Sequence, residues 1–170
     1  MMKGRALKFG DNISTDAIIP SHLAELRSIL PELAKHIFED IDPGFLKKVK
    51  PGDFLVAGRN FGLGSSREYA PRVIKISGIS AILAKTVARI FFRNAVNIGL
   101  PILRCNTDEI GEGDELEVDL ESGLVKDVSR GIELISTRIP PFMSRILEAG
   151  GLLPYIEKYG DFQIEKVRDG

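Results

Sequence analysis

Residues 53–58 read Asp-Phe-Leu-Val-Ala-Gly, and residues 79–86 read Ile-Ser-Ala-Ile-Leu-Ala-Lys-Thr. Both are short apolar runs bounded by glycine or polar residues, as is typical of buried strands. Residues 70–77 and 87–97 have the apolar spacing of helices, each ended by a glycine, and residues 101–103 begin a third apolar run. This strand, helix, strand, helix, strand order is typical of a parallel sheet with right-handed crossovers. The sequence therefore predicts an α/β layer.

The pattern changes on both sides of this region. Residues 115–120 alternate acidic with apolar side chains, and residues 124–125 and 132–134 continue the alternation after turns, which predicts an antiparallel meander. Residues 5–9 predict a short strand near the N-terminus. A helical pattern follows Pro31, with Leu33, Ile37 and Phe38 on one face and a break near residues 42–44, and a second one follows the Pro140-Pro141 pair. The mixture predicts a layered α/β domain whose partly parallel sheet carries added antiparallel strands.

Length and composition narrow the function classes. With 170 residues, 44% hydrophobic and 28% charged, the chain is expected to form a single domain over residues 1–170, with a frayed charged tail at 161–170. The apolar runs are too short to cross a bilayer and no apolar signal core is present, so we expect a cytoplasmic protein without membrane contact. A net charge of −1 gives no bulk attraction to nucleic acid. Cys105 is the only cysteine, which excludes an internal disulfide and a multi-cysteine metal site within this chain.

The segment Gly58-Arg-Asn-Phe-Gly-Leu-Gly-Ser-Ser-Arg-Glu68 is the strongest candidate for chemistry, since it joins a predicted strand to a predicted helix. Its glycines allow close backbone approach, and its N–H groups and Arg67 could hold a carboxylate or phosphate while Ser65 or Ser66 faces the reacting carbon. Alternatively, Ser65 and Glu68 form a capping box and the segment is a structural turn. The spacing matches neither a dinucleotide fingerprint nor a P-loop. The residues alone favour anion binding.

Two weaker candidates flank this segment. Residues 14–20, Ser-Thr-Asp-Ala-Ile-Ile-Pro, place Asp16 ahead of an apolar run, although Thr15 or Asp16 capping a turn is the commoner role. In residues 89–97, Arg89 and Arg93 share one helix face and could attract a carboxylate, although a solvated face is commoner. Phe92 and Val96 are expected in the core on another face, and Cys105 is expected to be packed rather than reactive.

Three long motifs together resemble the small subunits of 3-isopropylmalate dehydratase. They are residues 8–20 (Lys-Phe-Gly-Asp-Asn-Ile-Ser-Thr-Asp-Ala-Ile-Ile-Pro), residues 58–68 quoted above, and residues 88–101 (Ala-Arg-Ile-Phe-Phe-Arg-Asn-Ala-Val-Asn-Ile-Gly-Leu-Pro). The resemblance covers nearly the whole chain with the motifs in the same order. Because that subunit is similar to the swivel domain of aconitase, the resemblance implies a layered β/β/α swivel domain and a two-chain hydro-lyase.

The resemblance also implies the roles of individual residues. No cofactor is expected on this chain; a large partner subunit would carry a [4Fe-4S] cluster and form a heterodimer or heterotetramer with it. Ser65 would be the base that removes a proton next to a carboxylate, and Arg67 would bind a substrate carboxylate with Ser66 as a second contact. Asp16 would support proton transfer. The N–H dipoles around Gly62 and Gly64, together with Arg67, would stabilise the serine oxyanion.

Departures from the family pattern concern the substrate. The loop at residues 21–30 is about one residue longer than in relatives, and Arg27 is its expected substrate contact, while its leucines and Ile29 line a pocket or join the core. Leu63 stands where many relatives have Cys, and Tyr69 stands where His is usual. The expected substrate is 2- or 3-isopropylmalate in leucine synthesis. Homoaconitate or 2,3-dimethylmalate chemistry, or a non-catalytic anion-binding module, remain alternatives.

Overall fold

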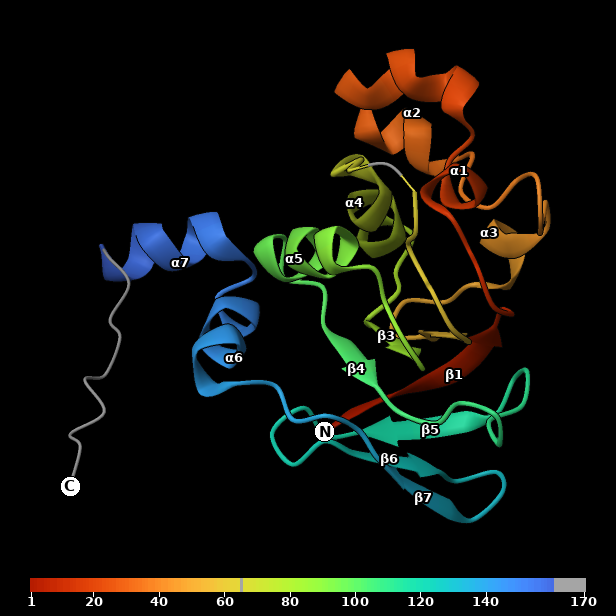
Figure 1. Ribbon diagram of the computed structural model, residues 1–170, viewed down its shortest axis with the longest axis vertical. Helices are drawn as coiled ribbons and strands as arrows, with labels where there is room; N and C mark the ends of the chain where they lie inside the picture. The colour runs from red at the N-terminus through yellow and green to blue at the C-terminus, as the bar shows by residue number, and fades with distance from the viewer. Residues whose placement is uncertain (65, 161–170) are drawn as a thin grey trace.

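The chain is built around a seven-stranded mixed sheet (Figure 1). The computed structural model describes residues 1–64 and 66–160. The predicted frayed tail at 161–170 lies outside these residues. The strand order is β4-β3-β2-β1-β5-β6-β7. The strands are β1 (Met2–Lys8), β2 (Phe54–Ala57), β3 (Ala81–Ala84), β4 (Ile102–Arg104), β5 (Glu115–Val118), β6 (Leu124–Asp127) and β7 (Ile132–Ile135). The predicted class, an α/β fold with a partly parallel sheet and added antiparallel strands, is confirmed.

Strand β1 joins a parallel half of the sheet to an antiparallel half. On one side it pairs in parallel with β2, with Leu7 opposite Leu55, and β3 and β4 continue the parallel order. On the other side it pairs antiparallel with β5, with Gly4 opposite Leu116, and β6 and β7 follow as a meander. The parallel strands need crossover connections, which helices provide, whereas short turns suffice for the antiparallel ones.

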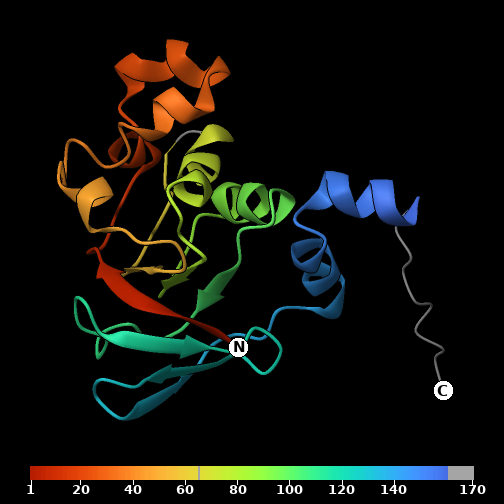
Figure 2. The ribbon, with the colours of Figure 1, turned by 180° about the vertical axis from the view of Figure 1, so that it is seen from behind.

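The helices lie mainly over the parallel half. Both views show α4 and α5 against that half, and α6 and α7 standing to one side of it beyond α5 (Figures 1 and 2). The helical segments are α1 (Thr15–Ile18), the 3₁₀ helix η1 (Ser21–Ser28), α2 (Leu30–Ala34), α3 (Phe45–Lys48), α4 (Tyr69–Ile76), α5 (Arg89–Asn97), α6 (Pro141–Glu148) and α7 (Leu152–Tyr159). No helix among the described residues is both long and apolar enough to cross a membrane.

Alternate residues of the parallel strands face two separate cores. Leu55 and Ile82 join the core under the helices, whereas Phe54 and Leu83 join a second core shared with Leu116 and other side chains of the antiparallel half. The antiparallel strands therefore cover the face of the parallel sheet that the helices leave open. Burying each such large apolar side chain contributes about 1.5–3 kcal/mol. This two-sided burial explains why the parallel strands are continuous apolar runs and gives the predicted β/β/α layering.

Two acidic side chains are buried at the sheet. Asp53, 3% exposed, accepts a hydrogen bond from Nη2 of Arg5 at 2.6 Å and from the N–H of Lys50 at 2.8 Å. Burial raises its pKa, but these hydrogen bonds outweigh burial and the net pKa of Asp53 is lowered. Asp127, 1% exposed, lies beside Asp114, and burial together with that second carboxyl raises the pKa of Asp127. The two buried acids thus have opposite effects on stability as pH changes.

Two local expectations needed correction. The helix after Pro31 is short, because α2 ends at Ala34 and the chain continues in turns to Phe38, which has a φ of +57° and packs with its ring centroid 4.5 Å from that of Phe9. In α5 the buried aromatic ring is Phe91, whereas Phe92 is half-buried between two clusters; Val96 is buried as expected. The packing of neighbouring elements decides where the first helix ends and which phenylalanine is buried. The spacing of apolar residues in the sequence does not contain this information.

Candidate functional site

The candidate site lies at the carboxyl ends of β1 and β2. Beyond these strands the two chain segments remain hydrogen-bonded: the Asn12 N–H donates to the carbonyl of Arg59 at 2.8 Å, and the Gly62 N–H donates to the carbonyl of Ile13 at 2.7 Å. The Thr15 N–H then donates to the carbonyl of Leu63 at 2.9 Å. The first and second motifs of the sequence, about 48 residues apart, therefore form one structural unit. Ligands of open α/β sheets bind at this edge.

Two glycines allow the segment to pass close to its neighbours. Gly62 has a φ of +75°, and a Cβ there would come within 2.7 Å of Cβ and 2.6 Å of Cδ2 of Phe91. Gly64 has a φ of +109°, and a Cβ there would lie 3.2 Å from Oγ1 of the buried Thr15. The backbone conformation disfavours a side chain at both positions, and the contacts with Phe91 also exclude one at Gly62. The glycine spacing therefore fixes the path of the segment against α1 and α5.

Helix α1 presents Asp16 to the other segment. The Ser14 side chain caps this helix by accepting a hydrogen bond from the Ala17 N–H at 3.0 Å, so the cap is Ser14 and not Thr15 or Asp16 as the turn interpretation expected. The exposed Asp16 carboxylate is consequently free of capping and forms an ion pair with the Arg67 guanidinium. Arg67 Nη1 also lies 3.5 Å from the carbonyl oxygen of Ile19. Two predicted site residues are thereby brought together.

The remaining residues of the glycine-rich motif lie between these groups and α4. Gly64 and Ser66 are exposed, and Arg67 is half-buried. Ser65, the predicted base, lies outside the described residues. Helix α4 begins at Tyr69 with Glu68 as its N-cap and no side-chain capping bond, which agrees with a helix start near residue 70. The roles assigned to these side chains remain predictions.

Arg27 faces the same region from η1. It lines a pocket of about 210 Å³ together with Leu30, Glu68, Tyr69 and Arg72, so it lies across this pocket from the residues that follow Arg67. Other apolar side chains of the 21–30 loop, Leu23 and Leu26, pack against the helical core, whereas Ile29 is 52% exposed.

Sequence reasoning missed Arg72 and Tyr69 as members of this pocket. Their spacing of three residues in a helix places them on one face of α4, and that face was the available signal. Only the fold shows that η1 and α2 stand opposite it.

Cys105 lies in the second core. It is 8% exposed, and burial raises the pKa of its thiol to about 11, so the prediction of a packed cysteine is confirmed. Among residues 1–64 and 66–160, no group of three or more His, Cys, Asp or Glu side chains is placed to hold a metal ion. Arg89 and Arg93 are exposed on α5, as expected for a solvated face.

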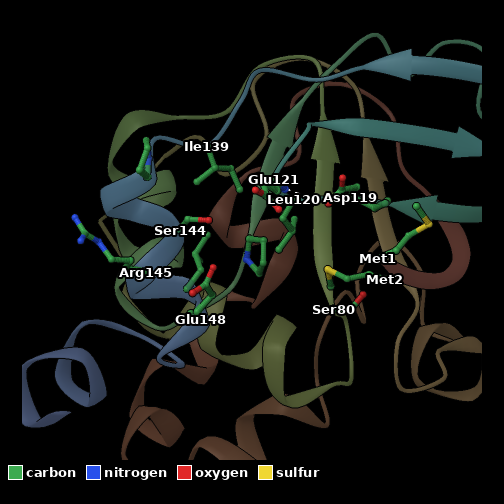
Figure 3. Close-up of a pocket in the computed structure, with 15 residues that line it drawn as sticks. Met1, Met2, Ser80, Asp119, Leu120, Glu121, Ile139, Ser144, Arg145 and Glu148 are labelled. Atoms are coloured by element: carbon green, nitrogen blue, oxygen red, sulfur yellow. Dashed lines mark hydrogen bonds between the residues drawn. The ribbon is translucent and has the colours of Figure 1, made fainter. Parts of the chain in front are cut away.

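Another pocket, larger than the one beside Arg27, lies at the opposite edge of the sheet (Figure 3). It measures about 660 Å³ and includes Ser80 and Pro101, which precede β3 and β4. Ile139, Ser144 and Glu148 stand on one side of it and Met1 and Met2 on the other (Figure 3). None of the predicted site residues that the structure describes lines it, so pocket size alone would point away from the motifs.

The geometry at the carboxyl edge suits recognition of a small carboxylic acid. A guanidinium forms charge-assisted, often bidentate, hydrogen bonds with a carboxylate. In this structure Arg67 binds one carboxylate already, that of Asp16. Exposed backbone around Gly64 and the hydroxyl of Ser66 lie next to it in the chain. The edge therefore offers a guanidinium, a hydroxyl and exposed backbone as groups that could bind a carboxylate.

Comparisons with known proteins agree with this picture. Residues 35–107 match the family model described as the aconitase C-terminal domain. The chain is 59% identical to the 3-isopropylmalate dehydratase small subunit 2 of Archaeoglobus fulgidus, over 96% of this chain and 99% of the relative. It is 55% identical to the small subunit 1 of Thermotoga maritima, over 95% and 98% of the two chains.

Two further matches come from Methanocaldococcus jannaschii, a curated sequence and a solved structure. One, named isopropylmalate/citramalate isomerase small subunit, is 50% identical over 93% of this chain and 95% of the relative. The other is a crystal structure of 3-isopropylmalate dehydratase, which superimposes with a TM-score of 0.88 at 47% identity and covers 92% of this chain and 93% of that one. The chain therefore agrees with these relatives in fold and in the length of sequence that aligns.

Proposed function

The chain belongs to the family of 3-isopropylmalate dehydratase small subunits, and from that premise we propose that its carboxyl edge is one half of a hydro-lyase active site. The reaction is the interconversion of 2- and 3-isopropylmalate by dehydration and rehydration, a step of leucine synthesis. The observation that carries the proposal is the pairing of Asp16 with Arg67 beside the glycine-rich segment. Residues of two family motifs, distant in sequence, meet there at one exposed edge.

The residues of this chain do not fit a [4Fe-4S] cluster, which the family uses for this chemistry. Such clusters are held by cysteine thiolates, and the whole sequence contains one cysteine, whose buried thiol has a pKa raised to about 11. We therefore assign the cluster to the large subunit. There it would supply a Lewis acid for the substrate hydroxyl. This chain supplies the groups that bind carboxylate and move the proton.

The proposed roles follow from what the reaction requires. A proton must leave the carbon next to a carboxylate while the hydroxyl leaves the neighbouring carbon, and both must return with their positions exchanged. Ser65 is the proposed base, on the strength of the motif. Arg67 is the proposed carboxylate ligand, with Ser66 beside it. When substrate enters, its carboxylate would share or replace Asp16 at the guanidinium, and Asp16 would then be available to the proton-transfer network.

The ordinary acidity of a serine hydroxyl is too weak for this task without local stabilisation. N–H dipoles and a fixed positive charge lower the cost of the oxyanion when they are already in place. Gly64, whose backbone approaches Thr15, and Arg67, held by Asp16, are positioned by hydrogen bonds and packing before substrate binds. This arrangement supports the assignment of an activated hydroxyl to the segment between them.

The choice among related substrates depends on the pocket beside Arg27. Leu30 offers apolar surface for an isopropyl group, whereas Arg27 and Arg72 offer charge for a further carboxylate. One relative is named for both isopropylmalate and citramalate. We propose isopropylmalate as the substrate, with citramalate, homoaconitate and 2,3-dimethylmalate as the compounds to compare. The active form is proposed to be a cytoplasmic heterodimer or heterotetramer with the large subunit.

Reconstitution tests the proposal. The purified chain, the cluster-loaded large subunit and their mixture are each assayed with these four acids, following the change in ultraviolet absorbance as the alkene form is made or, with homoaconitate, consumed. We expect turnover only in the mixture and the highest kcat/KM with isopropylmalate. Turnover by this chain alone, or a mixture that binds these acids without converting any of them, would contradict the proposal. The second result would instead support a non-catalytic anion-binding module.

A further inference from the structure

A second pocket opens along the carboxyl edge of the parallel strands, beyond the ends of β3 and β4. It measures about 480 Å³ and is lined by Arg59, Lys85, Arg104, Cys105, Asn106, Asp108 and Thr137. Arg59 begins the same segment that carries Arg67. The pocket therefore shares an edge with the candidate active site, yet none of the proposed catalytic or substrate-binding residues that the structure describes lines it.

Positive charge dominates this pocket. Three of its side chains are cationic and one is anionic, and the anion, Asp108, is paired with Lys85. The hydrogen bond from Lys85 lowers the pKa of Asp108, and the charges of Lys8 and Arg59 lower it further, so Asp108 is ionised at neutral pH. Within the described part of the chain, the guanidinium groups of Arg59 and Arg104 make no hydrogen bond or ion pair, and both residues are exposed.

The backbone beneath the cations is fixed. The Arg59 N–H donates to a carboxylate oxygen of Asp11 at 2.6 Å, and the Lys85 N–H donates to the carbonyl of Gly58 at 3.0 Å. Arg104 is the last residue of β4, where it pairs with the neighbouring strand β3. Three cationic side chains thus project from rigid positions on three segments. Of these, Arg59 and Arg104 have no counter-ion among the described residues, and holding such like charges together has an electrostatic cost that an external anion would relieve.

The position of the pocket indicates where that anion comes from. If the active site is completed by a second subunit, as proposed above, that subunit must cover the edge where Arg67 and Asp16 lie. A pocket on the same edge then lies under or beside it. Exposed, long cationic side chains suit carboxylates carried on a protein surface better than a small enclosed ligand, for which buried donors are typical.

We propose that Arg59, Lys85 and Arg104 form a docking site for an acidic segment of the large subunit, one that presents at least two Asp or Glu side chains. This inference rests on the proposed function and adds to it the chemistry of the subunit contact. The site acts on association: opposite charges steer the encounter and fix its register, and salt weakens the effect. Lys85 exchanges or shares Asp108 when the acidic segment arrives.

The experiment compares two charge-reversed full-length chains. The test variant carries Arg59→Glu and Arg104→Glu, and its matched control carries Lys126→Glu and Lys158→Glu, on β6 and α7, so both change the net charge equally. Circular dichroism and thermal unfolding establish that both fold. Stopped-flow mixing with the cluster-loaded large subunit gives association rate constants at about 0.05 M and 0.5 M salt, where screening lengths differ about threefold.

We expect the test variant to associate at least about tenfold more slowly than the wild type at low salt, with a smaller difference at high salt. The control variant should differ far less, and both should reach wild-type kcat once the subunits are saturated. Equal rates for the test variant and the wild type, or equal slowing of the control, would overturn the docking site.

A small-anion site is the other outcome that the same chains can reveal. Saturable binding of inorganic phosphate or citrate at Arg59 and Arg104, with unchanged association to the large subunit, would overturn the docking site in favour of a small ligand. These results are separable from a failure of the proposed function, because that failure is the absence of isomerase activity in the wild-type mixture. If the wild-type mixture is active, the association rates of the variants test the docking site alone.

Discussion

Replacing Gly62 by alanine tests whether the glycine-rich segment is held against α5 as described. The new Cβ would lie 2.6 Å from Cδ2 and 2.7 Å from Cβ of Phe91, which is 2% exposed and cannot move outward. The φ of +75° adds the cost of a left-handed backbone for a residue with a side chain. That backbone costs about 1 kcal/mol, and overpacking a filled core costs about 1–3 kcal/mol more. We expect a loss of about 2–4 kcal/mol in the free energy of unfolding.

The matched control is Gly113→Ala, because Gly113 has a φ of +80° and no heavy atom of the described residues lies within 4 Å of the Cβ that alanine would add there. Urea unfolding of both variants separates the clash from the backbone cost, and the control should lose only about 1 kcal/mol. In a double-mutant cycle, Gly62→Ala should cost less when added to Phe91→Ala than when added to the wild type, because the clash with the ring is gone. If Gly62→Ala is no more destabilising than Gly113→Ala, the contact with Phe91 does not hold the segment, and the reasoning fails.

Three further predictions concern charged groups. Arg67→Lys in the reconstituted enzyme should lower kcat/KM by about 10–100-fold, the value of one charge-assisted hydrogen bond. The control, Arg93→Lys on the exposed face of α5, should leave steady-state kinetics unchanged. Equal kinetics for both variants would contradict the role of Arg67. Asp53→Asn should lower the free energy of unfolding at pH 7 by about 2 kcal/mol, the value of a hydrogen bond to a charged group, because the partly exposed Arg5 loses its carboxylate partner. Because the folded-state pKa of Asp53 is lowered, the difference in free energy of unfolding between wild type and variant should be constant above the ordinary aspartate pKa. It should vanish as pH falls through the lowered pKa. Urea titrations at several pH values in which the two stabilities do not converge in acid would refute this prediction. Asp127→Asn should instead raise the free energy of unfolding at pH 7, because the folded pKa of Asp127 is raised and its ionisation opposes folding. The gain in stability should disappear in acid. A variant less stable than the wild type at pH 7 would show that this prediction is wrong.

The parallel half of the fold could be predicted from local sequence because its signals are local. Apolar runs such as residues 79–86 and the glycines that end each helix are read without knowledge of neighbours. The antiparallel meander could also be predicted, because the alternation of acidic and apolar residues in 115–120 is a local signal. What the sequence could not express is that the meander folds over the second face of the parallel strands, so that Phe54 meets Leu116 in a shared core. That contact joins residues far apart in sequence.

The candidate site shows the same division. The motifs predicted which residue types matter, and the structure then placed Asp16 against Arg67 across 51 positions. The N-cap of α1 is Ser14, not Thr15 or Asp16. Because Ser, Thr and Asp all cap helices well, the sequence did not show which of the three would do so. Arg72 was missed because its partner surface, η1 and α2, is set by tertiary packing. The cationic pocket was missed because its three cations come from three separate segments.

The proposed base is tested by Ser65→Ala in the reconstituted enzyme, with Ser122→Ala in the exposed turn between β5 and β6 as control. Single-turnover and steady-state assays with isopropylmalate should show kcat reduced by about 10³-fold or more in the Ser65 variant, while its affinity for the large subunit and the control's kcat stay at wild-type values. A Ser65→Ala enzyme that turns over as fast as the wild type would contradict the assignment of proton transfer to this chain.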